Sequence, residues 1–215
     1  MNMKREITDC PEKLKEEYGF SWMEHVLAIP SPLVNVTTYK KNGLPNATMQ
    51  SWCTFVGENG YHVIFGSVNK NGHMYKSCKE TGSCVVNIPS KDVFLRCMAT
   101  IENNGYDNDE ITMSGLSVIE AHKIKAPMIA ECMVNLECEF EWEHDLVEDG
   151  YSVVMCFKVV NVWMDECLFD EKSQGRYGDN GYLYNIHSPQ NPEDGKEYET
   201  YVGTIKKLAT YNELK

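Results

Sequence analysis

The sequence predicts a mainly β protein with a few helices, folded as an antiparallel barrel. Two observations favour this fold class: a β-rich run, Leu33–Tyr39, followed by the hairpin-type turn Asn42-Gly43, and alternating apolar and acidic residues from Cys132 to Glu143. Asn-Gly between β-rich segments is a strong hairpin signal, and a period of two is typical of a half-buried antiparallel strand. Strands and helices do not alternate regularly, as they would in a fold built from β-α units.

The composition indicates a soluble globular protein. The chain has 215 residues, 42% of them hydrophobic, and a net charge of −12, so it is long enough for one substantial domain with its own core. No apolar stretch reaches the length of a membrane span, and Met1 to Phe20 is too charged for a signal peptide. The acidic charge argues against nucleic acid as a partner. We expect a cytoplasmic protein with no membrane partner.

The cysteines and histidines predict no metal site. Nine cysteines form no CxxC pair, which favours reduced thiols in a cytosol. Cys132 and Cys138 fall on one face of a predicted strand, as small buried apolar residues do. The six histidines are scattered, with no pair at metal-ligand spacing.

The first half of the chain combines helical and extended segments. A helix or two is expected over Cys10–Leu27, with Asp9 as candidate N-cap, before Pro30 ends it. Further helices are expected over His73–Thr81, closed by Gly82, and over Lys91–Thr100, with Ser90 as N-cap. Strands are expected over Leu33–Tyr39, Tyr61–Val68 and Ser83–Ile88.

The second half is dominated by two long strands. Glu102–Glu110 should be an exposed loop, and Met113–Ile129 two extended or irregular pieces. The strand from Cys132 should pair with Tyr151–Met164, and Tyr182–Ile186 is one more strand. Polar and acidic residues occupy alternate positions of the first long strand: Asn135, Glu137, Glu139, Glu141 and Glu143. We expect them to form a solvated strand face rather than a pair of catalytic carboxylates.

Pro45–Trp52 fits neither a helix face nor a strand. Amide, hydroxyl and small side chains follow one another and end at a tryptophan. Such a segment can direct backbone N–H groups and short polar side chains toward a flat ligand. We interpret it as a ligand-binding loop on a β scaffold.

Familiar catalytic motifs are absent. The chain has no GxGxxG after a strand, no GxxxxGK[ST], no GxSxG and no HExxH. Tyr75, Lys76 and Lys79 form either a phosphate-binding patch or the solvated side of a short helix, and composition alone leaves both interpretations open.

Ten short motifs follow one another between Pro30 and Asp165: Pro32-Leu33-Val34, Val36-Thr37-Thr38, Asn42-Gly43, Asn46-Ala47, Ser51-Trp52, Glu80-Thr81-Gly82, Val85-Val86-Asn87-Ile88-Pro89-Ser90, Gly115-Leu116-Ser117, Ala126-Pro127 and Leu136-Glu137-Cys138. In this order they resemble the flavin reductase-like family, of the flavoredoxin type. The resemblance implies a split β-barrel, bound FMN, and a homodimer whose interface helps to form the flavin site.

The resemblance also implies a set of cofactor-binding residues. The flavin ring and ribityl chain should lie along Asn46, Ala47, Thr48, Met49, Gln50, Ser51 and Trp52, with Ser67, His73 and Tyr75 near the phosphate. Many relatives have Thr or Ser immediately before the Tyr75 position, where this chain has Met74, so one hydroxyl ligand for the phosphate is missing. Cys53, beside Trp52, is interpreted as a packed thiol rather than a flavin contact.

By the same resemblance the chain should be an NAD(P)H-dependent flavin reductase that passes electrons from FMN to a flavin, a metal ion or a protein. Because the cofactor performs this chemistry, no catalytic side chain is expected. The alternatives are a non-enzymatic FMN electron carrier reduced by a partner protein, and a split-barrel module that binds haem or another metabolite. We expect a helical segment packed on the barrel (residues 1–29), the flavin domain (30–165) and an extension of it (166–215).

Overall fold

The computed structural model describes residues 3–7, 21–169, 175–196 and 199–214. The chain divides into two compact units, a larger one of residues 32–183 and 204–215 and a smaller one of residues 1–31 and 184–203. The three-part division expected from the sequence stays a prediction. Among the described helices, none is long and apolar enough to cross a membrane.

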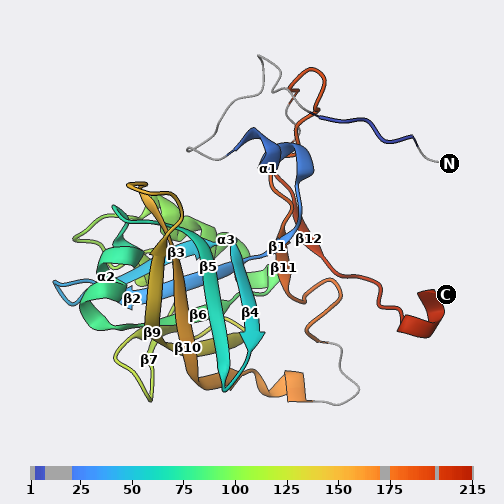
Figure 1. Cartoon of the computed structure of the whole chain (residues 1–215). Helices are drawn as coiled ribbons and strands as arrows, with labels where there is room; N and C mark the ends of the chain where they lie inside the picture. The colour runs from blue at the N-terminus through green and yellow to red at the C-terminus, as the bar shows by residue number, and fades with distance from the viewer. Residues whose placement is uncertain (1–2, 8–20, 170–174, 197–198, 215) are drawn as a thin grey trace. The chain divides into compact units, whose positions relative to one another are not determined.

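The larger unit is built on a seven-stranded antiparallel sheet in the order β3-β2-β6-β9-β10-β5-β4 (Figure 1). Every predicted strand of this region is present, and β3 and β4 are additional strands that the sequence pattern did not indicate. The strands are β2 Val34–Tyr39, β3 Pro45–Gln50, β4 Cys53–Gly57, β5 Tyr61–Asn69, β6 Ser83–Ile88, β9 Val134–Asp145 and β10 Ser152–Met164.

The two edge strands of this sheet are neighbours in the chain. Strand β3 ends at Gln50 and β4 begins at Cys53, so Ser51 and Trp52 alone connect opposite edges of the sheet. A two-residue connection spans less than about 11 Å, whereas seven strands laid flat would place the edges several times farther apart. The sheet must therefore curl until its edges meet, which confirms the predicted barrel with few helices.

The β2–β3 hairpin forms at the predicted Asn42-Gly43 turn. Lys40 N–H donates to Leu44 O, Leu44 N–H donates to Asn42 Oδ1 at 3.1 Å, and Gly43 has φ of 83°. Glycine adopts this left-handed conformation without the steric cost that a Cβ would bring. The turn fixes the register of the two strands, with Thr38 opposite Asn46 and Val36 opposite Thr48.

The interpretation of Pro45–Trp52 as a loop is wrong for its first six residues, which form β3. Pairing with β2 overrides the weak strand propensity of Asn46 and Ala47. Pro45 is tolerated because β3 is an edge strand, where a missing N–H breaks no second ladder. A polar sequence can therefore be a strand when a neighbouring strand supplies the backbone partners.

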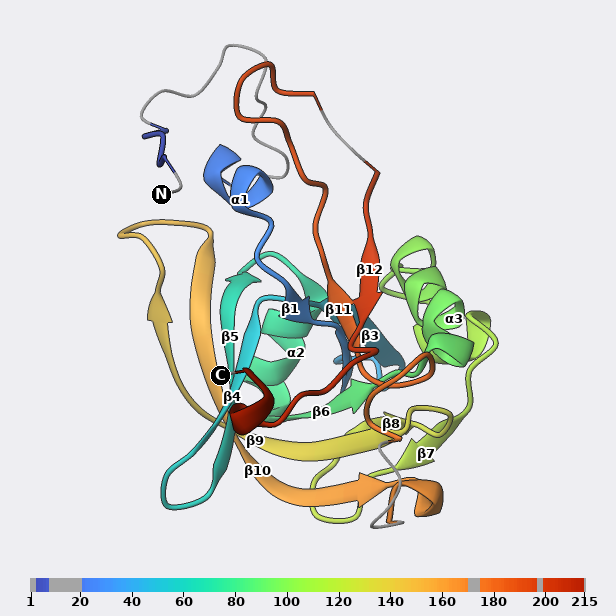
Figure 2. The same ribbon diagram turned by 90° about the vertical axis from the view of Figure 1, so that its right-hand side faces the viewer.

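Helix α2, His73–Thr81, matches its prediction, and Gly82 closes it with φ of 71°. Its apolar side packs into the interior of the barrel, and Figure 2 shows it within the curve of the sheet. Met74 and Cys78 contribute from the helix, together with Val36, Val63, Phe65, Val86, Leu136 and Phe157 from the strands.

Helices α3, Lys91–Glu102, and α4, Glu110–Met113, cover the outer side of β3. Helix α3 begins after Ser90 as predicted, although the Ser90 side chain makes no capping hydrogen bond. Helix α4 was not predicted, and its N-cap Asp109 accepts from Thr112 N–H at 2.9 Å. A second apolar cluster lies between these helices and the sheet: Ala47, Val93, Cys97, Ile111, Leu116, Ile129 and Cys132.

The loop from Glu102 to Glu110 is exposed or half-buried, in partial agreement with the expectation, except at Glu110. Glu110 is fully buried and is the first residue of α4. The difference arises because Lys40, also buried, lies 3.0 Å from its carboxylate. A carboxylate leaves water only where charges and donors compensate it.

The solvated acidic face predicted for β9 is wrong at Asn135 and Glu137, which are 5% and 0% exposed. The register explains the difference, because β9 is paired with β6 on one side as far as Glu139 and with β10 on the other. The chain around His122 then covers Glu137. Its carboxylate accepts from the His122 and Lys123 N–H groups, from Asn161 and from Trp163, at 3.0, 2.6, 2.8 and 2.7 Å.

The outer half of β9 extends beyond β6, and its acidic residues are paired with bases. His62 lies 3.2 Å from Glu141, Lys79 lies 3.2 Å from Glu143, and Lys70 lies 2.7 Å from Asp145. These contacts join β9 to α2 and to the region of β5. Exposed pairs of this kind add little stability, at most about 1 kcal/mol each.

Short elements complete the larger unit. Between α4 and β9 the chain forms the hairpin of β7, Val118–Glu120, and β8, Pro127–Ile129, which agrees with the expectation of two extended or irregular pieces. The 3-10 helices η1, Glu166–Phe169, and η2, Tyr211–Leu214, follow β10 and β12 respectively.

The smaller unit contains helix α1, Trp22–Leu27, whose N-cap Ser21 accepts from Met23 N–H at 3.3 Å. Most of the helix predicted over Cys10–Leu27, with its candidate N-cap Asp9, lies outside the described residues. A small three-stranded sheet has the order β1-β11-β12. Its strands are β1 Ser31–Pro32, β11 Leu183–Asn185 and β12 Val202–Thr204, and β11 confirms the strand predicted over Tyr182–Ile186.

We predict that Glu137→Gln destabilises the protein by about 2 to 3 kcal/mol, because the amide would turn one N–H group toward N–H donors in a buried position. Urea unfolding at pH 7 measures the loss. The control is Glu139→Gln, since Glu139 is exposed on the same strand. Equal stabilities of the two variants would contradict the prediction.

The same carboxylate makes stability depend on pH. Burial opposes the ionisation of Glu137, but its four hydrogen bonds outweigh burial and lower its pKa from 4.5 to about 2. A lowered pKa stabilises the folded state fully above pH 4.5, and this contribution is lost as the pH falls toward 2. The difference in unfolding free energy between wild type and Glu137→Gln should therefore shrink between pH 4.5 and 2.

Candidate functional site

The predicted ligand-binding segment lies at the seam where the edges of the sheet meet, which we define as β3, Ser51, Trp52 and the adjoining end of β5. After β3 the chain turns at once, with Cys53 N–H donating to Ser51 O at 2.9 Å. Trp52 O accepts from Gly66 N–H at 2.7 Å, which places the link beside Ser67. The barrel closure thus brings Ser67 close to residues that precede it by many positions.

Strand β3 presents two different faces. Ala47 packs in the apolar cluster under α3 and α4, with Met49 against the same cluster. Since strand side chains alternate, Asn46, Thr48 and Gln50 share the opposite face. Thr48 stands opposite Val36, whose side chain lies in the barrel interior. The amide and hydroxyl groups therefore face the side on which α2 lies.

Asn46 is fully buried and organises this polar face. Its amide nitrogen donates to the hydroxyls of Thr38 and Thr48, both at 3.3 Å. Its Oδ1 atom is buried without a hydrogen-bond partner among the described residues. Thr48 and Gln50, by contrast, are half-buried and can be reached from outside. These two residues are accordingly better placed for direct contact with a ligand than Asn46.

The free edge of β3 also carries backbone groups. Ala47 N–H points away from β2 and donates to Glu110 Oε2 at 2.9 Å. Because the direction of N–H groups alternates along an antiparallel strand, Met49 N–H points away from β2 as well. The seam thus offers a backbone donor next to the side chains of Thr48 and Gln50.

Helix α2 brings two more of the predicted residues to this region, since it contacts both β2 and β3. Its N-cap is Gly72, which has no side chain to satisfy the first N–H groups of the helix. The turn before it is closed by Gly72 N–H, which donates to Asn69 O at 3.0 Å. His73 and Tyr75 lie in this uncapped first turn. Free N–H groups at a helix N-terminus attract anions.

His73, Tyr75 and Ser67 each have neighbours in the structure. His73 Nδ1 lies 3.5 Å from Glu110 Oε1, and its ring stands edge to face with Tyr106 at 6.2 Å. Tyr75 OH donates to Glu143 at 3.1 Å, and burial and this bond raise its pKa. Ser67 Oγ lies 3.3 Å from Ser152 Oγ.

The open question about Tyr75, Lys76 and Lys79 has a partial answer. Tyr75 and Lys79 both contact Glu143, so a carboxylate already occupies the position that a phosphate would take between them. Lys79 also lies over the Phe140 ring, 4.6 Å from its centre. These contacts favour the structural interpretation for this pair, whereas the role of Lys76 stays open.

Sequence reasoning missed Glu110, which accepts from Ala47 N–H of the seam, and Lys40, which pairs with Glu110. The usable signal was Asp109, an N-cap residue followed by the apolar Ile111. It predicts a helix start, and therefore an ordered chain, inside the acidic stretch from Glu102 to Glu110. No sequence pattern indicates that Lys40 is buried, because its burial depends on the fold of the loop that contains Gly105 and Asn108.

Cysteine chemistry does not contribute to the seam. Burial raises the pKa of Cys53 to about 12, so it is a protonated thiol at neutral pH, as interpreted from the sequence. Cys132 and Cys138 are buried free thiols, in agreement with the sequence. No group of three His, Cys, Asp or Glu side chains in the described part of the chain could hold a metal ion.

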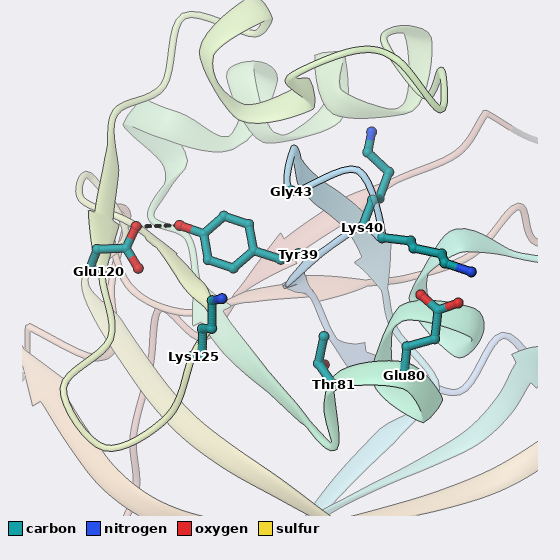
Figure 3. A pocket seen from close by; sticks show the side chains of 8 residues that line it. Tyr39, Lys40, Gly43, Glu80, Thr81, Glu120 and Lys125 are labelled. Atoms are coloured by element: carbon teal, nitrogen blue, oxygen red, sulfur yellow. Dashed lines mark hydrogen bonds between the residues drawn. The ribbon is translucent and has the colours of Figure 1, made fainter.

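A charged pocket of about 780 Å³ lies beside the β2–β3 turn and the end of α2 (Figure 3). Tyr39 OH donates to Glu120 across it. None of the predicted cofactor-binding residues lines this pocket, and its charged lining consists of three lysines and two glutamates. The lining residues are Tyr39, Lys40, Lys41, Gly43, Glu80, Thr81, Glu120 and Lys125.

Comparison with known proteins identifies similar folds. The family model described as "Flavin reductase like domain" matches residues 26–185. Component B of nitrilotriacetate monooxygenase from Bacillus cereus is 18% identical, with 96% of this chain and 100% of that chain covered and a TM-score of 0.75. Flavoredoxin of Desulfovibrio vulgaris is 19% identical, with 91% and 96% covered and a TM-score of 0.64.

A third similar structure is a Shewanella frigidimarina protein with a split barrel domain. It is 15% identical, with 87% of this chain and 88% of that chain covered and a TM-score of 0.70. At these identities the structures establish the fold and not the activity. The fold is a split β-barrel, as the sequence resemblance implied.

Proposed function

Since the chain belongs to the flavin reductase like family, we propose that it binds FMN at the seam and transfers electrons from NAD(P)H through this flavin to a second acceptor. The acceptor would be a flavin, a metal ion or an electron-transfer protein. The proposed location is cytoplasmic.

The observation that carries this proposal is the position of the polar face of β3 beside the uncapped N-terminus of α2. Thr48 and Gln50 are half-buried on this face, and Met49 N–H lies at its edge. An isoalloxazine ring carries N–H and C=O groups along one edge and is apolar elsewhere. The amide, hydroxyl and backbone groups along the edge of β3 can form hydrogen bonds with these N–H and C=O groups of the ring. Trp52, at the end of the segment, offers an aromatic surface.

The residues present also fit a phosphate. Gly72 leaves the first N–H groups of α2 uncapped, and His73 stands in that first turn. A helix N-terminus carries a partial positive charge that favours a phosphate. The missing hydroxyl at Met74 is compensated in this proposal by the imidazole of His73.

The flavin, when bound, would itself supply the hydride and electron chemistry. The protein residues hold it and exclude water from one of its faces. Reduction builds negative charge on the pyrimidine part of the ring, and N–H donors fixed in place stabilise such charge without reorganisation. The barrel holds Met49 and Gln50 in a hydrogen-bonded strand, which makes their donors rigid.

A non-enzymatic electron carrier is the second candidate. One of the similar structures is described as a flavoredoxin, and a seam that binds FMN serves a carrier as well as a reductase. The two differ in whether a nicotinamide can approach the flavin. A binding module for haem or another metabolite is the third candidate, and it needs no flavin at all.

We predict that the protein binds FMN saturably, and that Thr48→Val weakens binding about three- to tenfold, the loss expected for one hydrogen bond of about 1 kcal/mol. Fluorescence titration of FMN measures both affinities. The matched control is Thr54→Val, because Thr54 is exposed on β4, and its affinity should equal that of wild type. A colourless protein without saturable FMN binding would favour the third candidate.

Anaerobic mixing distinguishes the reductase from the carrier. The FMN-loaded protein should lose its oxidised flavin absorbance rapidly with NADH or NADPH, and the faster of the two identifies the donor. If neither nicotinamide bleaches the flavin but a reduced ferredoxin-like protein does, the carrier is correct. The absorbance band should return when air or an acceptor is added.

We further propose a homodimer, as the resemblance implies. Leu95, Met98 and Ile101 follow one another at three-residue spacing on α3 and form an apolar stripe, being 77%, 37% and 51% exposed. Apolar groups clustered on one face indicate a partner surface. Light scattering after gel filtration should show a dimer for wild type and a monomer for Leu95→Glu. Ile119→Glu, at an exposed apolar residue of β7, should remain dimeric; a dimeric Leu95→Glu variant would exclude this surface.

A further inference from the structure

Glu110 is a buried carboxylate that joins three elements of the larger unit. It is fully buried, although it begins the short helix α4 at the end of an exposed loop. Its Oε2 atom accepts from Ala47 N–H on β3 at 2.9 Å, and its Oε1 atom lies 3.0 Å from Lys40 Nζ. The same Oε1 atom lies 3.5 Å from Nδ1 of His73 on α2.

Lys40 is the counterion that allows this burial. Its side chain is 1% exposed, and Nζ donates to Gly105 O at 2.8 Å, to Asn108 O at 2.7 Å and to Glu110. All three of its donors are therefore used. A buried ion pair adds little net stability compared with an apolar pair of the same size, whereas loss of one partner leaves an uncompensated buried charge and is strongly destabilising. The contribution of the pair then lies in the geometry that it fixes.

The Lys40–Glu110 ion pair fixes two features of the seam. The bond to Ala47 N–H satisfies one outward group of the edge strand and holds β3 at a set distance from α4. The carboxylate also faces Nδ1 of His73, which is buried and makes no hydrogen bond of normal length. The Nδ1 atom is thus the nitrogen whose proton Glu110 attracts, and Nε2 is the nitrogen left for another ligand.

The charges of the network leave room for an anion. Lys40 and Glu110 compensate each other in charge, so the buried pair does not oppose an anion at the uncapped first turn of α2. Tyr106, the other neighbour of the imidazole, is an uncharged contact. A phosphate monoester would bind at Nε2 while Glu110 faces Nδ1, an arrangement that fixes the ring as carboxylates fix metal-ligating imidazoles.

We infer that Glu110, held by Lys40, is a positioning residue that orients His73 toward the phosphate of the flavin and so sets the preference for FMN over riboflavin. The inference rests on the proposed flavin site. It adds a residue that does not touch the ligand, and it predicts a selective effect: the phosphate-dependent part of the affinity should fall, with the ring-dependent part maintained.

The test compares FMN and riboflavin affinities by fluorescence titration. Wild type should prefer FMN, and Glu110→Gln should reduce this preference about tenfold, which corresponds to about 1.4 kcal/mol. Gln keeps an oxygen for Ala47 N–H and removes the charge. His73→Gln should show the same reduction, and combining the two changes should add little, because both act on one contact.

A second variant keeps the test decisive if Glu110→Gln alone does not fold, since that change leaves the buried charge of Lys40 unpaired. Lys40→Met with Glu110→Gln removes both buried charges, so neither is left unpaired, and it should show the same reduced preference. Equal weakening of FMN and riboflavin in the folded variants, or no change in either, would overturn the inference and leave the flavin site standing. A wild-type protein that binds neither flavin would overturn the proposed function and the inference together.

Discussion

The two-residue connection between β3 and β4 constrains the rest of the larger unit. Ser51 and Trp52 join opposite edges of a seven-stranded sheet, and this is geometrically possible only when the sheet is curled into a barrel. Closure places Trp52 against Gly66 and leaves the outer edge of β3 without a strand partner. It also encloses α2, whose Met74 and Cys78 fill the interior. The proposed flavin site is a consequence of the same closure, since it lies where the edges meet.

Charge placement follows from the barrel as well. The chain is strongly acidic, yet among the described residues the carboxylates of Glu110 and Glu137 are fully buried, with different partners. Glu137 accepts four hydrogen bonds and ties the chain around His122 to β9 and β10. Glu110 is matched by Lys40 and faces the seam. Burial of a charge requires such compensation, so each buried carboxylate marks a place where several chain segments are held together.

The absence of catalytic motifs from the sequence is consistent with the proposed chemistry. A flavoprotein needs a cofactor held in position and charges fixed near it, and the cofactor carries out the electron transfer. The parts that suit this task are ordinary structural ones: a strand edge, an uncapped helix and a buried ion pair. None of them has a characteristic residue spacing, which is why a search for motifs alone finds no active site in this chain.

The sequence by itself determined five of the seven strands of the large sheet (β2, β5, β6, β9 and β10), the turn at Asn42-Gly43, helices α2 and α3, and the burial of Cys132 and Cys138 as free thiols. These features depend on local signals: turn chemistry, periodicity and capping. It also determined the family, through an ordered set of short motifs. The positions of Asn46 to Trp52 could be named but not their conformation, because a polar segment becomes a strand only when β2 supplies its backbone partners.

The tertiary structure decided what is buried. Glu110 and Glu137 look like solvated residues in the sequence, since alternation and loop composition say nothing about a distant segment that covers them. Lys40 reaches Glu110 across 70 positions, and His122 covers Glu137 from a different hairpin. The physical reason is that burial of a charge depends on donors and counterions brought from far along the chain, and these exist only once the barrel has closed.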